Sequence, residues 1–165
     1  MVISRIITVI IVFIIITFVM NNCFKTNTWM VKKQFEILSS SIEKKQGEKL
    51  LNTGLKKNRI NDLFAPKCKF KTQLYKNSGP FTPMEISNRL FAVRNNFLYL
   101  STHFVDMKIS FPESNAAIAT FTVKATGKRS DGKIENYYRE ADCVLKFINK
   151  KWLISEIITV EVLQK

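Results

Sequence analysis

The chain changes character after residue 20. Residues 6–20 read IITVIIVFIIITFVM, fifteen residues with no charge and only two threonines, whereas the chain beyond residue 24 is rich in lysine. As a helix, such a run would span about 22 Å at about 1.5 Å per residue. Val2 and Ile3 bring it close to the length of a bilayer core if Arg5 reaches the headgroups. The sequence therefore predicts two parts: a signal anchor or transmembrane segment with a short link over residues 1–24, and one folded domain over residues 25–165.

The residues on either side of the apolar run indicate whether this N-terminal segment is cleaved. A basic start over residues 1–5 and an apolar run over 6–19 are typical of an export signal. The residues at 20–22 are Met-Asn-Asn, which lack the small side chains of a cleavage site, so we expect an uncleaved, single-pass anchor. Secretion after cleavage and lipid attachment at Cys23 are the alternatives. The five-residue tail favours a C-terminal domain outside the cytoplasm, in a bacterial periplasm or at the cell surface.

The chain is strongly basic, with a net charge of +13. Residues 25–79 hold thirteen Lys and Arg against four acidic residues, and residues 80–165 hold twelve against nine. Such a charge favours phosphate-bearing partners, anionic lipid or an acidic protein, but a solvated lysine-rich surface is the preferred explanation. Nucleic-acid binders usually combine clustered arginines with exposed aromatic residues. This chain is dominated by lysine, so nucleic acid is not an expected partner.

Three cysteines and one histidine limit the metal and redox chemistry. Cys23, Cys68 and Cys143 form no CxxC pair, and His103 is the only histidine, so we expect no zinc site and no cofactor. Outside the cytoplasm Cys68 and Cys143 could form a disulfide if their Cα atoms were close enough. Two buried free thiols are the alternative.

The pattern of apolar residues predicts an α+β domain. Thr82, Pro83 and Glu85 form the start of a helix with a capping box. Val105, Met107, Ile109 and Phe111 alternate as one face of a strand. Helices are predicted over residues 29–45, 48–57 and 83 to about 100, and strands over 68–74, 103–111, 116–126, 134–147 and 152–163.

This order of elements resembles the nuclear transport factor 2-like superfamily, which includes SnoaL-like proteins and has a cystatin-like cone fold. The resemblance covers residues 29–163 and rests on that order, on Trp152-Leu153-Ile154 after a short turn, and on the strand-like string ATFTVKATG at 119–127. It implies about three helices packed on a curved antiparallel sheet around a conical pocket, here in a membrane-tethered member. Fold alone does not give function.

A catalytic site in such a cone would need an acid or base in a dry pocket. Weak candidates are Asp106, Tyr138, Glu140 and the lone His103. Alternation along residues 134–147 places Tyr138, Glu140 and Asp142 on one face and Tyr137, Arg139, Ala141, Cys143, Leu145 and Phe147 on the other, which is the more apolar. This puts the carboxylates outside the cone and favours a function without catalysis. Arg139 could bind an anionic ligand or form a cross-strand ion pair.

The sequence thus predicts a membrane-anchored, non-catalytic binding or assembly module of the cell envelope. A signal anchor followed by this fold resembles the scaffold proteins of type IV secretion and conjugation systems. That resemblance implies attachment to a membrane through residues 6–20 and a protein partner or homodimer contact through the outer sheet face. The alternative is a SnoaL-like small-molecule-binding protein or an enzyme of the isomerase, cyclase or hydrolase type, with a hydrophobic ligand in the cone. A cone filled by large side chains would favour the first function, and an open cavity the second.

Overall fold

The computed structural model describes residues 10–11, 27–72 and 79–160. A helix over residues 27–42 is followed by α2 (Leu50–Asn61), β1 (Phe64–Thr72), β2 (Pro80–Phe81), α3 (Pro83–Asn95), β3 (Phe97–Glu113), β4 (Ala116–Arg129), β5 (Ile134–Ile148) and β6 (Lys151–Val160). The α+β class and the order of helices and strands agree with the sequence prediction. The two-residue strand β2 is an addition to it.

The predicted membrane anchor lies outside the described residues except for Ile10 and Ile11, whose side chains are exposed. Over residues 10–11, 27–72 and 79–160, no helix is both long enough and apolar enough to cross a membrane. Membrane attachment, single-pass topology and the location of the domain therefore stay predictions.

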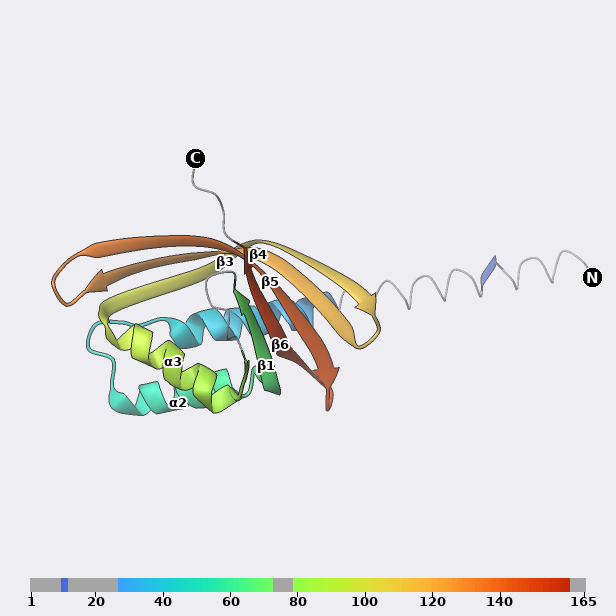
Figure 1. The fold of residues 1–165 in the computed structure, drawn as a ribbon, viewed down its shortest axis with the longest axis horizontal. Helices are drawn as coiled ribbons and strands as arrows, with labels where there is room; N and C mark the ends of the chain where they lie inside the picture. The colour runs from blue at the N-terminus through green and yellow to red at the C-terminus, as the bar shows by residue number, and fades with distance from the viewer. Residues whose placement is uncertain (1–9, 12–26, 73–78, 161–165) are drawn as a thin grey trace, which may run out of the picture.

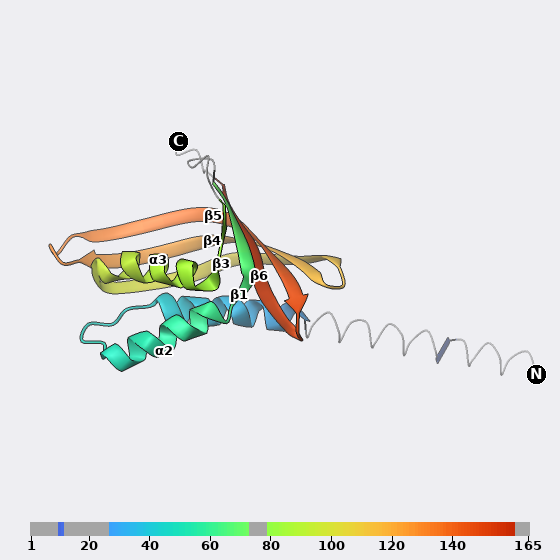
Figure 2. The same ribbon diagram turned by 60° about the horizontal axis from the view of Figure 1, so that its bottom comes forward.

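The six strands form one curved sheet in the order β2-β1-β6-β5-β4-β3. The helix over 27–42, α2 and α3 lie on one side of it (Figures 1 and 2). The strands from β3 to β6 are antiparallel neighbours, but β1 pairs with β6 in parallel. The predicted antiparallel sheet is therefore wrong in this respect, because the sheet is mixed. A parallel pair needs a long crossover connection, and α3 with β3, β4 and β5 provides it here.

Helix α3 begins as the sequence predicts. The Thr82 hydroxyl accepts a hydrogen bond from the Glu85 amide at 3.3 Å, and the Glu85 carboxylate accepts one from the Thr82 amide at 2.8 Å. The capping box is confirmed, with Pro83 in the first turn. The helix ends at Asn95 rather than near residue 100, because the chain from Phe97 onward pairs with β4.

Gly127 of β4 makes room for this early start of β3. A Cβ at residue 127 would collide with Phe97 Cδ1 and lie 2.7 Å from Phe97 Cε1, so only glycine lets the ring lie against the strand. Leu100, three residues after Phe97 on β3, exchanges two backbone hydrogen bonds with Lys44, at 2.8 and 3.0 Å. These bonds fix the end of the first helix to β3.

A bulge in β3 reverses which side chains face the helices. Asp106 has a φ of +56°, and the register against β4 shifts between Val105 and Lys108. Val105 pairs with Thr122, whose neighbours Phe121 and Val123 pack against the core, so Val105 faces the other way. The residues that pack inward are Leu100, Thr102 and Phe104 before the bulge and Met107, Ile109 and Phe111 after it. The predicted strand face is therefore correct only beyond the bulge.

Trp152 is the largest fully buried side chain among the described residues. Its side chain is 1% exposed, and its ring packs against Phe111 and Phe147 with centroid distances of 5.7 and 5.2 Å. Leu145 and Ile154 beside it are fully buried. Within the described residues the Trp152 indole N–H has no hydrogen-bond partner. This residue therefore contributes to stability through apolar packing.

Candidate functional site

An open cavity of about 690 Å³ lies inside the cone. The helix over 27–42, α3 and five strands contribute to its wall. Its apolar lining residues are Leu38, Ile42, Phe64, Phe70, Phe81, Ile86, Leu90, Phe104, Val123 and Ile157. This volume and this predominantly apolar lining are typical of small-molecule sites, which usually measure about 300–1,000 Å³.

Large aromatic side chains fill only part of the cone. Phe35, Phe104 and Phe121 pack edge to face, with centroid distances between 4.8 and 5.5 Å. Phe104 is also a lining residue, so this cluster forms one wall of the cavity. On β1 and β2, Phe70 and Phe81 form a second edge-to-face pair at 5.5 Å, and both line the cavity. The rings thus shape the cavity without closing it.

Two polar side chains line the cavity within the described residues, Thr102 and Arg89. Thr102 is 6% exposed, and its carbonyl accepts a hydrogen bond from the Ser39 hydroxyl. Arg89 is exposed and lies one helical turn after Ile86 on α3. Its guanidinium carbon lies 4.5 Å from the centroid of the Phe81 ring. Arg89 therefore combines contact with the cavity and access to solvent, which places it at the cavity rim.

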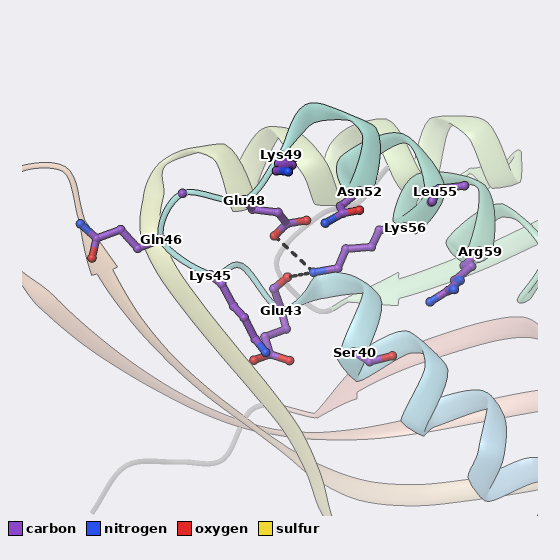
Figure 3. A pocket seen from close by; sticks show the side chains of 11 residues that line it. Ser40, Glu43, Lys45, Gln46, Glu48, Lys49, Asn52, Leu55, Lys56 and Arg59 are labelled. Carbon is purple, nitrogen blue, oxygen red and sulfur yellow. Dashed lines mark hydrogen bonds and ion pairs between the residues drawn. The ribbon is translucent and has the colours of Figure 1, made fainter.

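A second hollow, of about 560 Å³, lies between α2 and the loop that follows the first helix (Figure 3). Its centre is occupied by Lys56, whose ammonium donates to the Glu43 carbonyl at 2.6 Å and to Glu48 Oε2 at 3.2 Å. Lys45, Lys49 and Arg59 lie around it. The central Lys56 ammonium already has two partners within the chain. We therefore assign this cleft a role in holding the helices together rather than in binding a ligand.

Arg94 connects this cleft to α3. Its side chain is 2% exposed; it donates to the Ile42 carbonyl at 3.0 Å and to the Glu43 carbonyl at 2.9 Å, and it pairs with Glu48 Oε2. Burial raises the pKa of Glu48, but the Lys56 hydrogen bond and the charges of Arg94 and Lys56 outweigh it and lower the pKa overall. One ion-pair network therefore holds the end of the first helix, α2 and α3 together.

The four predicted catalytic candidates do not meet in the cone. Asp106 is exposed at the bulge, and Tyr138 and Glu140 are exposed on the outer face of β5. His103 lines a third hollow, of about 430 Å³, as does Glu36, and the Nε2 of His103 is 3.0 Å from Ser101 Oγ. None of the four lines the apolar cavity. Their catalytic roles stay predictions.

The alternation predicted for β5 agrees with the structure over residues 140–145, whereas Tyr137 and Phe147, predicted on the inner face, are 51% and 39% exposed. Ala141, Cys143 and Leu145 are buried, whereas Glu140 is exposed on the opposite face. Asp142 is half-buried there and accepts a hydrogen bond from Thr120 at 2.7 Å. Arg139 donates to the Tyr137 hydroxyl at 3.1 Å, and among the described residues it forms no ion pair with a carboxylate.

Cys68 and Cys143 are free thiols, which answers the alternative left open by the sequence. They lie on β1 and β5, which flank β6. Two strand spacings correspond to roughly 9.6 Å, which exceeds the Cα separation that a disulfide accepts. Burial, and secondarily Glu156, raises the pKa of Cys68 to about 12. Burial likewise raises the pKa of Cys143. Across the described residues, no group of three or more His, Cys, Asp or Glu side chains could hold a metal ion.

Arg89 is the site residue that the sequence prediction missed. The helical period that joins Ile86 and Leu90 predicts Val93 on the same apolar stripe, but Val93 is 58% exposed, while Phe91 and Arg94 are buried. The signal for Arg89 was its spacing, three residues after Ile86 and directly before Leu90. An arginine at the border of an apolar helical stripe can place its methylenes over the core and its charge at the edge.

Comparison with solved structures identifies the fold. A provisionally assigned scytalone dehydratase from Novosphingobium aromaticivorans superposes with a TM-score of 0.69 at 12% identity, over 86% of this chain and 89% of that one. A hexachlorocyclohexane dehydrochlorinase, LinA-type3, from Novosphingobium barchaimii gives 0.66 at 7% identity, over 85% and 89%. A nuclear transport factor 2-like superfamily protein from Salmonella enterica gives 0.62 at 16% identity, over 88% and 95%.

These likenesses concern the fold alone, because the identities are low. The chain has the nuclear transport factor 2-like cone fold that the sequence resemblance implied. No protein-family model and no curated protein sequence matches the chain.

Proposed function

We propose that this domain binds an apolar small molecule in the cone cavity. The observation that carries the proposal is the cavity itself, about 690 Å³ of open space with ten apolar residues in its wall. A well-packed interior leaves few voids larger than a water molecule. An open space of this size therefore needs a reason, and ligand binding is the simplest one.

The open cavity favours the small-molecule alternative over an assembly function. An assembly module would not need an open cone, and no comparison supports a role in secretion or conjugation. Two of the similar solved structures are described as a dehydratase and a dehydrochlorinase, which agrees with small-molecule chemistry in this fold. For this chain we propose binding rather than catalysis, since the polar lining among the described residues is limited to Arg89 and Thr102. Neither is a general base with a partner to orient it.

The affinity would come from removing apolar surface from water. Each methylene buried in such a wall contributes about 0.8 kcal/mol, and the loss of ligand freedom offsets part of the sum. A ligand of about a dozen carbon atoms should therefore bind with a dissociation constant on the order of 10 µM.

The test is a fluorescence titration with N-phenyl-1-naphthylamine, a neutral apolar dye whose emission rises in a dry site. Val123 lines the cavity from β4, so Val123→Phe places a ring in the space that the ligand would occupy. We expect saturable binding to the wild-type chain and a loss of at least tenfold in affinity for Val123→Phe.

The matched control is Val93→Phe, which makes the same change at an exposed position of α3 away from the cavity. It should bind the dye as the wild type does. Thermal unfolding of both variants checks that they fold. Equal dye binding by folded Val123→Phe and Val93→Phe would show that the dye binds elsewhere and would contradict the proposal.

The proposal also places the domain at a membrane through residues 6–20, outside the cytoplasm, with the outer sheet face available to a protein partner or a second copy. Carbonate extraction of membranes tests the attachment. An intact chain should stay in the pellet, and a soluble form that begins after residue 20 would show that the segment is cleaved.

A further inference from the structure

Arg89 is the one cationic side chain that lines the apolar cavity within the described residues. Ile86 and Leu90, its neighbours on the inner face of α3, are lining residues as well. Ile86 is 3% exposed, whereas Arg89 is exposed. Arg89 thus lies at the border between the face of α3 that lines the cavity and the face that is exposed to solvent. A ligand with its apolar part against Ile86 and Leu90 would have its solvent-side end near the guanidinium.

No carboxylate of the described residues forms an ion pair with Arg89. The nearest acidic neighbour on its helix face is Glu85, one turn earlier. The Thr82 amide and the Thr82 hydroxyl both donate to Glu85 Oε2, at 2.8 and 2.9 Å. These hydrogen bonds lower the pKa of Glu85, with only a smaller effect of the Arg89 charge. The cap therefore engages the Glu85 carboxylate, and the guanidinium donors are left for another anion.

The Phe81 ring fixes where the guanidinium lies. The guanidinium carbon of Arg89 is 4.5 Å from the ring centroid, which is a cation–π distance. Phe81 in turn packs edge to face on Phe70, at 5.5 Å. A guanidinium has five N–H donors, so Arg89 over this ring can still bind a planar oxyanion through two parallel hydrogen bonds.

We propose that the cavity takes an amphipathic carboxylate, with its apolar body in the cone and its carboxylate on Arg89. This inference rests on the proposed function and adds the chemical class of the ligand. An apolar wall alone would not distinguish an alcohol from an acid of the same length. A single unpaired guanidinium at the rim does, because a charge-assisted hydrogen bond is stronger than a neutral one. Solvent at the rim weakens this advantage, so we expect a preference of about tenfold.

The experiment compares dodecanoate with dodecanol by displacement of the bound dye from the full-length chain. The two probes share a chain length and differ in head group. Wild-type protein should bind dodecanoate about tenfold more tightly than dodecanol. Arg89→Gln should bind both with the affinity that the wild type shows for dodecanol. Arg89→Lys should keep part of the preference, since lysine retains the charge but not the paired donors.

The control is Arg59→Gln, which makes the same change of charge on α2, at the hollow around Lys56. It should keep the wild-type preference for dodecanoate. Decanoate provides a second check, because removal of two methylenes should weaken binding by about fifteenfold if the chain lies in the cone. Equal affinities of the wild type for acid and alcohol, or an unchanged preference in Arg89→Gln, would overturn the role of Arg89 while leaving cavity binding intact. Failure of both probes to displace the dye would overturn the proposed function as well.

Discussion

Removal of Arg94, in the last turn of α3, should strongly destabilise the domain. Its guanidinium donates to the carbonyls of Ile42 and Glu43 and pairs with Glu48, and both charged side chains are at least nine-tenths buried. Arg94→Met keeps much of the apolar volume but removes all three interactions. Loss of one partner of a buried ion pair typically costs about 3–5 kcal/mol when the other charge is left without compensation. Lys56 still pairs with Glu48 at 3.2 Å after the change, so the loss should lie near the lower end of this range, at about 3 kcal/mol. We expect a loss of that size in the free energy of unfolding.

Urea unfolding followed by tryptophan fluorescence measures this loss, since Trp152 is buried in the core. The double variant Glu48→Met with Arg94→Met should recover about 1–3 kcal/mol relative to the sum of the two single changes, because it also removes the buried carboxylate that has lost Arg94 as a partner. The control is Lys33→Met, which breaks an exposed pair with Glu36 and should change stability by less than about 0.5 kcal/mol. A loss below about 1 kcal/mol for Arg94→Met, or strict additivity in the double variant, would refute the view that this network holds the helices together.

Three further outcomes follow from burial. The folded-state pKa of Glu48 is lowered, so its contribution to stability is present above the unfolded pKa of about 4.3 and is lost as pH falls through the lower folded value; urea unfolding from pH 6 to pH 3 should show a shallower decline for Glu48→Gln than for the wild type, and parallel declines would contradict this. Trp152→Ala should cost about 3–5 kcal/mol in the same assay, whereas a loss under about 1 kcal/mol would place that ring outside the core. In a Cys23→Ser chain, Cys68 and Cys143 should resist a thiol reagent at pH 8 until urea unfolds the protein, and rapid labelling of the folded chain would be the contrary result.

Local patterns predicted most of the elements correctly. The capping box at Thr82 and Glu85 specifies the start of α3 through contacts within four residues of one another. Alternation along β5 correctly placed Cys143 and Leu145 inside and Glu140 outside, because side chains of a strand point to opposite faces in turn. These features depend on neighbours in the sequence, so the sequence alone contains the information that they need.

Features that depend on distant partners were not predictable in the same way. The end of α3 depends on the space that Gly127 leaves for Phe97, thirty residues earlier in the chain. The bulge at Asp106 appears only as a register shift against β4. The parallel pairing of β1 with β6 joins segments separated by more than eighty residues. Each of these is decided by tertiary packing, which a local pattern does not encode.

The candidate site was the least predictable part, because a search for catalytic groups favours carboxylates and histidine. His103, Asp106, Tyr138 and Glu140 were chosen for their chemistry, and none of them lines the cavity. A cavity is a property of the packed whole, so its apolar lining residues resembled ordinary core residues in the sequence. Arg89 could have been noticed only as a charge at the border of an apolar helical stripe.

The most direct test of the account is methyl NMR of the full-length chain, labelled at the isoleucine δ1 methyl groups, during titration with dodecanol. Ile86 and Ile157 line the cavity from α3 and β6, and Ile134 is exposed at the start of β5. We expect saturable shifts of the Ile86 and Ile157 methyl resonances and no shift of Ile134. Unchanged resonances of Ile86 and Ile157 at saturating dodecanol, or a shift of Ile134 alone, would contradict the claim that the cone is a binding site.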